Sequence, residues 1–245
     1  EGTNLALSDV DEAGLHETAE LIKGVKLTTH ILDVAKREAV YDFAEKVIAE
    51  HGSVQIVINN AGVAMTANMQ DITYEEFEWI MNINFWGMVY GSKAFLPHLL
   101  QQPKSWLANV SSIFGIITSP TQGAYNVSKF AIRAFTEALR QEMQETNLVV
   151  SSIHPGGIDT PIVQNGRYNA DSLSEADNQK QIRDFPKVAR TSAEEAAKVI
   201  MQGLKKEKKR ILIGKDARYL DRMQRLMPIG YERILDKIRK KVQGE

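Results

Sequence analysis

Short apolar runs rich in β-branched residues alternate along the chain with longer amphipathic stretches of helical period. The runs that predict strands cover residues 4–7, 26–30, 54–58, 107–110, 149–154 and 210–213. The stretches that predict helices cover residues 11–22, 36–50, 74–102, 123–145 and 193–206. Strands that alternate with helices in this way form a parallel sheet with helices on both of its faces. The pattern therefore predicts a doubly wound α/β fold.

Two of the predicted helix starts are marked by a local motif. Thr73-x-x-Glu76 and Ser192-x-x-Glu195 match the capping box, in which the hydroxyl and the carboxylate each accept a hydrogen bond from a backbone amide of the first turn. We therefore expect helices to begin directly after Thr73 and Ser192.

Two segments fall outside the regular alternation. Residues 161–189 show no clear period and are rich in Asn, Asp, Gln and Ser; loops of that length in compact domains are often lids, so we expect a substrate lid. The tail, residues 215–245, mixes many Arg and Lys with spaced apolar residues. Those apolar residues are Leu220, Met223, Leu226, Ile234 and Ile238. We favour a terminal helix pair that covers a cleft or packs on a neighbouring subunit, with a membrane-surface helix as the alternative.

Composition narrows the class of protein. With 245 residues, 43% hydrophobic and 25% charged, the chain predicts one globular domain over residues 1–245. A net charge of −1 gives no field for nucleic acid, and no run of about 18 apolar residues predicts a membrane span. The chain has no cysteine, which excludes disulfides and thiolate chemistry and favours a cytoplasmic location. The histidines show no metal-ligand spacing, so no metal site is expected.

The first residues match the second strand of a dinucleotide-binding unit rather than its beginning. Such a unit has a strand, a glycine-rich turn and a helix, and an acidic residue stands about 20 residues after the glycines at the end of the second strand. Asp9 stands where that acid would stand. We therefore expect the first strand and its glycine loop to lie before residue 1. The alternative for Asp9 is the N-cap of the helix that begins near Glu12.

The strongest chemical pattern is a serine at a strand end followed by Tyr-x-x-x-Lys. Ser112 is separated by 12 residues from Tyr125, and Lys129 stands four residues further on. That spacing puts the phenol and the ammonium on one helical face, where the positive charge can favour the phenolate. A free tyrosine has a pKa of about 10, and a general acid or base should titrate nearer the working pH. We therefore expect Lys129 and a cationic nicotinamide ring together to lower the pKa of Tyr125.

Taken with three further motifs, the chain resembles the short-chain dehydrogenase/reductase family over nearly its whole length. The further motifs are Asn-Asn-Ala-Gly at 59–62, Asn84 within Ile-Asn-Phe-Trp-Gly, and Pro155-Gly156 followed by Thr160. The resemblance implies that Tyr125 is the acid/base and that Ser112 holds and polarises the substrate oxygen. Lys129 would bind the nicotinamide ribose, and Asn84 would anchor a water in the proton relay.

The same resemblance implies a nucleotide cofactor. The cofactor-binding residues would be Asp9, Asp33, Asn60, Ala61, Gly62, Tyr125, Lys129, Pro155, Gly156, Ile158 and Thr160. A carboxylate at Asp9 can accept both ribose hydroxyls of NAD and would repel the 2′-phosphate of NADP, so NAD is favoured over NADP. Asp33 would face the adenine, although it could equally be an N-cap. His154 is interpreted as a core residue at a strand end.

The expected activity is NAD-dependent interconversion of a secondary alcohol and a ketone. Met65, Phe114, Ile116 and Ile117 lie near the motifs and suggest an apolar pocket for a hydrophobic substrate. One alternative is an NADP-dependent carbonyl reductase, and another is a non-catalytic nucleotide-binding regulatory protein. Because the helices at 74–102 and 123–145 resemble those that pair between subunits in this family, a homodimer or homotetramer is expected.

Overall fold

The computed structural model describes the backbone of residues 2–243 and the side chains of residues 2–237. All six predicted strands are present, with ends within two residues of the prediction. They are β1 (Leu5–Asp9), β2 (Leu27–Ile31), β3 (Ile56–Asn59), β5 (Ser105–Val110), β6 (Leu148–Pro155) and β10 (Arg210–Ile213). Four short pairs of residues form further strands that the sequence did not predict. These are β4 (Met65–Thr66), β7 (Ile158–Asp159), β8 (Arg167–Tyr168) and β9 (Thr191–Ser192).

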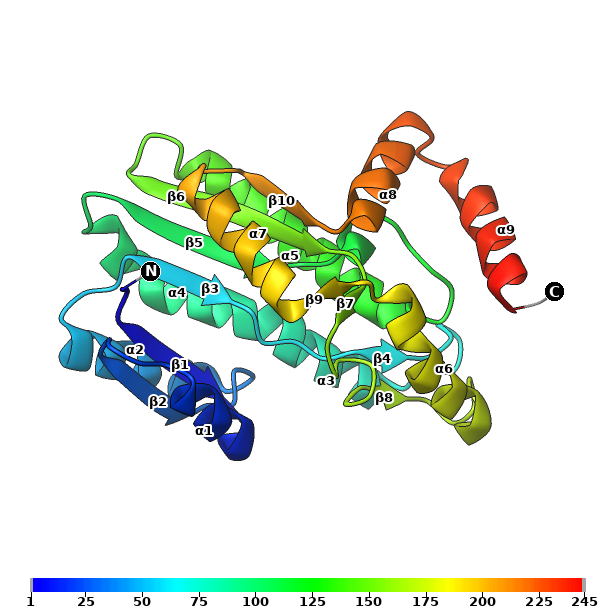
Figure 1. Ribbon diagram of the computed structural model, residues 1–245, viewed down its shortest axis with the longest axis horizontal. Coiled ribbons are helices and arrows are strands. Elements are labelled where there is room, and N and C mark those ends of the chain that lie inside the picture. The colour runs from blue at the N-terminus through cyan, green and yellow to red at the C-terminus, as the bar shows by residue number, and fades with distance from the viewer. Residues whose placement is uncertain (1, 244–245) are drawn as a thin grey trace.

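The long strands are parallel, and they form two sheets rather than the single sheet that the alternation suggested. Four strands pair in the order β10-β6-β5-β3, and β1 pairs with β2 (Figure 1). Among the described residues, no strand pairs with the second edge of β1 or with the second edge of β3. Two strand edges with free backbone groups therefore face the space between the two sheets.

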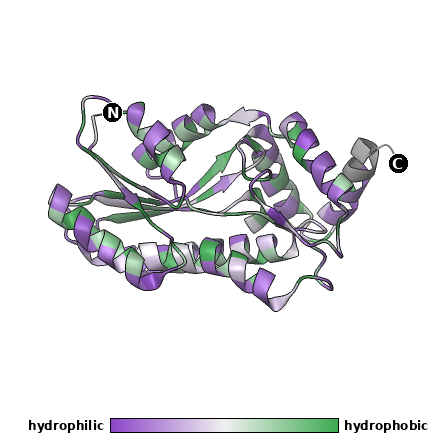
Figure 2. Cartoon of the chain, turned by 90° about the horizontal axis from the view of Figure 1, so that it is seen from below, coloured by the Kyte–Doolittle hydropathy of each residue, from purple (hydrophilic) through white to green (hydrophobic). Residues whose placement is uncertain are grey.

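Helices cover both faces of the four-stranded sheet, as Figure 2 shows from the side. On one face, α2 (Arg37–His51), α4 (Gly87–Leu100) and α5 (Gly123–Glu142) share a core with Leu107 and Val150 of the sheet. On the other face, α7 (Ala193–Lys205) packs on Ala108 and Ile153. Neighbouring residues of one strand point to opposite faces, which explains why these buried strands are apolar without a break. Both α7 and α3 (Tyr74–Met81) begin with the predicted capping boxes.

The helix predicted over 74–102 is interrupted. It consists of α3 (Tyr74–Met81), the π-helical turn η1 (Asn82–Trp86) and α4. A π turn contains one extra residue and is frequent at functional sites. Here Asn84, within the turn, is completely buried. Apolar periodicity does not reveal such a turn, because the residues on both sides keep the helical pattern.

The segment 161–189 is not the irregular loop that its sequence suggested. It contains β8 and the helix α6 (Glu175–Val188), which begins at the N-cap Ser174. The helix has no buried residue, so no apolar stripe marks it in the sequence. The segment is attached to the body where β8 pairs with β4 and where Asn169 donates a 2.9 Å hydrogen bond to Glu76.

The tail forms the favoured helix pair, α8 (Lys215–Leu226) and α9 (Tyr231–Gln243). The first of the two packs on β10 and on the turn η2 (Ile113–Gly115). Tyr231 is buried, and its hydroxyl forms a 3.1 Å hydrogen bond with the Thr118 hydroxyl. The side chain of Ile238 lies outside the described residues. Within the described part of the chain, no helix has the length and apolar character needed to cross a membrane.

Candidate active site

Ser112 stands two residues after the end of β5, as the N-cap of η2. Its backbone is extended, with φ −166° and ψ 168°, and its hydroxyl accepts a 3.1 Å hydrogen bond from the Phe114 amide. The side chain is 7% exposed. Strand end and tight turn together fix this hydroxyl at the carboxyl edge of the sheet, where α/β folds place their ligands.

Tyr125 and Lys129 lie in the first turns of α5, and the structure brings both to Ser112. The Lys129 Nζ atom is 5.5 Å from the centroid of the Tyr125 ring and donates a 3.2 Å hydrogen bond to the Val110 carbonyl. A side-chain hydrogen bond joins Ser112 to Tyr125. The three side chains that the sequence singled out therefore form one constellation, as their spacing predicted.

Burial governs the electrostatics of this constellation. Burial raises the pKa of Tyr125 to about 12, and the hydrogen bond with Ser112 offsets only part of that rise. Burial also lowers the pKa of Lys129 to about 8. In the protein alone, Tyr125 is therefore a protonated phenol, because desolvation dominates where both groups are almost completely buried. The lowering of its pKa by Lys129 and a nicotinamide ring together stays a prediction for the cofactor-bound state.

Asn84 joins the loop after β3 to helix α5. Its Oδ1 accepts a 2.7 Å hydrogen bond from the Val63 amide, while its Nδ2 donates to the Val63 carbonyl and to the Ser128 hydroxyl, both at 3.0 Å. Ser128 in turn donates to the Tyr125 carbonyl at 2.8 Å. The side chain of Asn84 therefore ties the loop around Val63 to the turn that carries Tyr125.

The loop at Asn60, Ala61 and Gly62 leaves its backbone open to close approach by a bound molecule. Asn60 and Ala61 are exposed at the carboxyl end of β3. A Cβ atom added at Gly62 would lie 3.2 Å from both the Asn84 Oδ1 and the Lys129 Nζ. Since only glycine leaves this space open, the loop fits a nucleotide cofactor that reaches the lysine.

A buried polar network below this loop was not predicted. Asn59 donates hydrogen bonds of 3.0 Å to Ser92 and 2.8 Å to Asn109, and Asn109 donates one of 3.1 Å to Thr136. These bonds connect β3, α4, β5 and α5 just beneath the site. The polar residues in otherwise apolar elements were the available signal, because buried polar groups need partners.

Asp9 and Asp33 lie at the ends of β1 and β2. Asp9 is exposed, and its side chain accepts a 3.0 Å hydrogen bond from the Asp11 amide. The N-cap of α1 (Glu12–Glu20) is Asp11, so the capping alternative for Asp9 is wrong. The side chain of Asp33 accepts a 3.0 Å hydrogen bond from the Ala35 amide, and the N-cap of α2 is Lys36. The capping alternative for Asp33 is therefore wrong as well.

The last residue of β6 and the loop after it contain four of the predicted cofactor residues: Pro155, Gly156, Ile158 and Thr160. Pro155 ends that strand, the Gly156 amide donates a 2.9 Å hydrogen bond to the Ile213 carbonyl, and Ile158 lies in β7. Thr160 lines a cavity of about 320 Å³. The other residues that line it come from the following loop and from α6: Asp159, Pro161, Val163, Gln164, Ile182, Phe185 and Pro186.

Asp216 of α8 holds this loop in place, which the sequence did not predict. Its carboxylate accepts a 2.7 Å hydrogen bond from the Gly157 amide. A Cβ atom at Gly156 would come within 2.1 Å of the same carboxylate, so the approach requires glycine.

The apolar pocket expected around Met65, Phe114, Ile116 and Ile117 is largely wrong. Met65, Ile116 and Ile117 are at most 2% exposed and belong to the core. Ile116 and Ile117 follow η2 and pack with residues of α8, whereas Met65 of β4 packs in one cluster with Tyr125. The Phe114 ring centroid lies 6.1 Å from that of Tyr125 in an edge-on contact.

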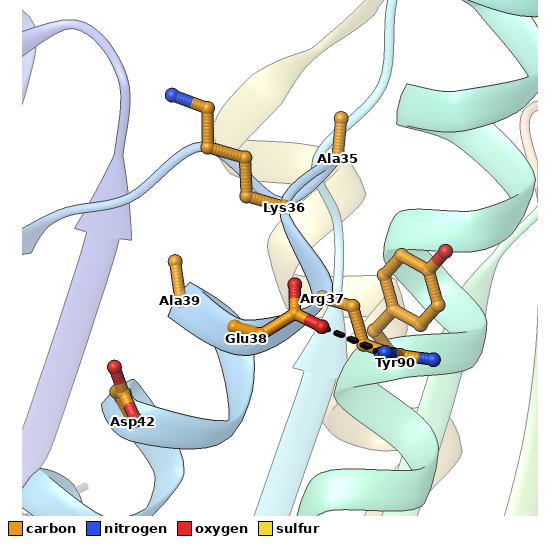
Figure 3. A pocket seen from close by; sticks show the side chains of 7 residues that line it. All are labelled: Ala35, Lys36, Arg37, Glu38, Ala39, Asp42 and Tyr90. Atoms are coloured by element: carbon orange, nitrogen blue, oxygen red, sulfur yellow. Dashed lines mark hydrogen bonds and ion pairs between the residues drawn. The ribbon is translucent and has the colours of Figure 1, made fainter.

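A second hollow, of about 610 Å³, lies at the start of α2 beside α4 (Figure 3). Its wall carries the ion pair between Arg37 and Glu38, with the Tyr90 ring nearby. None of the catalytic candidates lines it. In the described part of the chain, no three His, Asp or Glu side chains gather as a metal site would require.

Comparison with known proteins identifies this arrangement. The sequence profile described as "short chain dehydrogenase" matches residues 1–171. The chain belongs to the short-chain dehydrogenase/reductase family. Members of this family are NAD(P)-dependent oxidoreductases, so the protein is an enzyme of that type. A purely regulatory role without catalysis is therefore not retained.

Relatives in this family match along almost the whole chain. SadH of Mycobacterium tuberculosis, a protein assigned to the oxidoreductases, is 40% identical over 237 residues, which cover 94% of this chain and 84% of SadH. Estradiol 17-beta-dehydrogenase 11 of Pongo abelii is 29% identical over 245 residues, which cover 98% of this chain and 75% of that enzyme.

Solved structures of short-chain dehydrogenases have the same fold. A Burkholderia phymatum enzyme in complex with NAD superposes with a TM-score of 0.81 at 22% identity, covering 91% of this chain and 84% of that one. An alcohol dehydrogenase from Thermococcus sibiricus, complexed with 5-hydroxy-NADP, gives a TM-score of 0.70 at 24% identity, with 86% of each chain covered. Identities this low establish the fold and leave the cofactor choice open.

Proposed function

We propose that the protein is an NAD-dependent dehydrogenase that interconverts an apolar secondary alcohol and its ketone. The observation that carries the proposal is the meeting of Ser112, Tyr125 and Lys129 at the carboxyl edge of β5, with the glycine cradle of Gly62 beside the lysine. Nucleotide binding alone does not require a buried phenol that is hydrogen-bonded to a serine, whereas proton transfer to a substrate oxygen does.

In this proposal Ser112 and Tyr125 handle the substrate oxygen. During reduction, both hydroxyls donate hydrogen bonds to the carbonyl oxygen, and the Tyr125 proton moves to that oxygen as the carbon becomes tetrahedral. During oxidation, the alcohol proton moves to the Tyr125 oxygen, which must first have lost its own proton to become the phenolate. The cofactor, when bound, supplies or accepts the hydride. The raised pKa of Tyr125 suits the reductive direction, because the residue starts as the acid.

Lys129 and Asn84 position the reacting groups. The ammonium of Lys129 lies beside the Gly62 cradle, so it is placed to donate hydrogen bonds to ribose hydroxyls there. Asn84 keeps the Val63 loop and the Ser128 turn at a fixed separation. The backbone of the same π turn is where we place the relay water.

For the cofactor we propose NAD rather than NADP. Asp9 presents an exposed carboxylate at the carboxyl end of β1, beside the open strand edge. A carboxylate there can accept hydrogen bonds from two ribose hydroxyls and repels an added phosphate. Asp33, Asn60, Ala61, Pro155, Gly156, Ile158 and Thr160 complete the proposed cofactor surface.

We further propose that a strand preceding Glu1, followed by a glycine-rich turn, lies between β1 and β3. Both strands have an unpaired edge toward the same space, and a parallel strand there would join the two sheets into one doubly wound sheet in a single domain. The turn after that strand would supply the pyrophosphate site, which the described residues do not include.

The substrate class follows from the cavity beside Thr160. Val163, Ile182 and Phe185 give it an apolar wall, and α6 forms one side of it as a lid. Since the helix has no buried residue of its own, its contacts with the body are few and it can move aside. A hydrophobic alcohol or ketone fits such a wall better than a charged substrate.

The deciding experiment is Tyr125→Phe, assayed with NAD and a panel of apolar secondary alcohols. We expect turnover to fall by about 10²- to 10⁴-fold with folding intact, because only the acid/base hydroxyl is lost. Tyr74→Phe serves as the matched control, since Tyr74 is 86% exposed and lies away from the site. Equal turnover of both variants would overturn the assignment.

We also propose a homodimer or homotetramer assembled through the helices that follow Thr73 and Gln122. Trp86, Leu100 and Val127 of η1, α4 and α5 are each more than 40% exposed, so their side chains are available to pack against a second copy of these helices. Light scattering of the purified protein tests the assembly, and a monomer at micromolar concentration would contradict it.

A further inference from the structure

An apolar turn projects from the tail of the molecule. It comprises Leu226, Met227, Pro228, Ile229 and Gly230 and connects α8 to α9 (Figure 1). Leu226 is 82% exposed, Ile229 77% and Met227 39%. Single exposed apolar residues are ordinary, but this turn has no polar side chain among five successive exposed residues. A connection between two surface helices is normally polar. An apolar connection such as this one indicates a surface that binds another molecule.

The exposed face of α8 next to this turn is cationic. Lys215, Arg218, Arg222 and Arg225 follow one another at spacings of three and four residues, so they lie on one side of the helix. All four are exposed, whereas Ala217 on the opposite side is fully buried. The charge belongs to the tail rather than to the whole chain: residues 215–245 contain nine Lys and Arg against five Asp and Glu, while the net charge of the protein is −1.

We propose that the apolar turn and the cationic face of α8 dock the enzyme on an anionic lipid bilayer. In this arrangement Leu226 and Ile229 enter the boundary between headgroups and acyl chains, and Arg218 and Arg222 meet lipid phosphates. An apolar edge next to cations is the pattern of interfacial helices, and anionic leaflets attract clustered Lys and Arg. Neutral overall charge does not oppose docking, because the screened field of the tail acts only over about 10 Å.

A bilayer fits this surface better than a second copy of the chain. A stable protein interface buries roughly 800 Å² on each partner. The side chains of Leu226, Met227 and Ile229 on a narrow turn offer much less flat surface than a protein interface needs. Insertion into lipid requires only that these side chains protrude. The cations also suit phosphate headgroups more than they suit the same cationic face of a second subunit.

Docking through this turn would bring the catalytic edge toward the membrane. Helix α8 packs on η2, the turn that begins at Ser112, and Asp216 of the same helix holds the Gly157 loop. Figure 1 shows α6, α8 and α9 at the same end of the molecule. An apolar substrate dissolved in the bilayer would then lie close to the cavity beside α6.

The test is co-sedimentation of the full chain with vesicles of phosphatidylcholine alone and with vesicles in which phosphatidylglycerol replaces about a third of that lipid. We expect binding to the anionic vesicles that weakens with added salt. The double variant Leu226→Ser/Ile229→Ser should lower the partition coefficient by about tenfold or more. Arg218→Gln/Arg222→Gln should abolish the preference for anionic lipid.

Leu21→Ser is the matched control, because Leu21, the C-cap residue of α1, is 83% exposed and lies outside the tail. Its binding should equal that of the unchanged protein. Failure of the unchanged protein to sediment with anionic vesicles at low salt would overturn the proposal. So would a loss of self-association in the Leu226→Ser/Ile229→Ser variant, measured by sedimentation velocity without lipid, if vesicle binding stayed unchanged.

Discussion

His154 donates a 2.9 Å hydrogen bond from Nδ1 to the carbonyl oxygen of Ser112. The imidazole is fully buried, and its Nε2 lies 2.8 Å from the Ser152 hydroxyl. Because a carbonyl can only accept, Nδ1 carries the proton and Nε2 accepts from the serine in the neutral ring. The ring therefore anchors the backbone of Ser112, the proposed substrate-binding serine, from the neighbouring strand. It was interpreted from sequence only as a core residue.

This histidine predicts a loss of stability in acid. Burial lowers the pKa of His154 to about 4 from an ordinary value of 6.5. The unfolded chain therefore binds this proton first, and the stability is complete above pH 6.5 and is lost as the pH falls toward 4. The loss should reach about 3 kcal/mol. Urea unfolding at a series of pH values measures it, and His154→Gln should remove the corresponding slope.

Removal of the buried lysine charge should separate stability from activity. Burial lowers the pKa of Lys129 to about 8. At pH 7 the group is still charged, and its charge in a buried position lowers the free energy of unfolding. Lys129→Met should raise the stability of the cofactor-free protein by about 1 to 3 kcal/mol at pH 7. Turnover should fall by about 100-fold or more, because the ribose contact and the nearby charge are lost. A thermal melt measures the change in stability, and an initial-rate assay measures the change in turnover. A destabilised variant would contradict the argument.

Cofactor choice should depend on Asp9. Asp9→Ala should lower kcat/KM for NAD by about tenfold and raise it for NADP, because each lost charge contact is worth about 1.5 to 3 kcal/mol at most. Asp11→Ala is the matched control two residues away: it removes the cap of α1 and should cost stability without changing the cofactor ratio. If the ratio of kcat/KM for NAD to kcat/KM for NADP were unchanged in Asp9→Ala, the adenosine ribose would not bind at Asp9.

The amide of Asn84 should be irreplaceable by an apolar side chain. Asn84→Leu leaves the Val63 amide without its buried partner and removes the link to Ser128, so we expect a stability loss of about 2 to 4 kcal/mol. Residual folded protein should bind NAD more weakly. Asn84→Ala leaves room for water, and it should cost less than Asn84→Leu in a chemical unfolding experiment. The reverse order would argue against the hydrogen bonds as the cause.

The sequence predicted that three side chains come together better than it predicted their surroundings. Ser112, Tyr125 and Lys129 stand on one strand end and one helix, so their spacing alone implied that they meet. The π turn around Asn84 and the helix α6 were missed, because the first keeps the apolar pattern and the second has none. Contacts between distant elements, such as that of Asp216 with Gly157, depend on tertiary packing that no local pattern records.

The unpaired edges of β1 and β3 bear on how the protein behaves in solution. A parallel edge with exposed amides and carbonyls accepts any extended chain that reaches it. Any form of the polypeptide in which nothing occupies the space between these strands would recruit strands from neighbouring molecules. Such molecules should precipitate or exchange segments as their concentration rises, and an added peptide of β-strand character should suppress that aggregation.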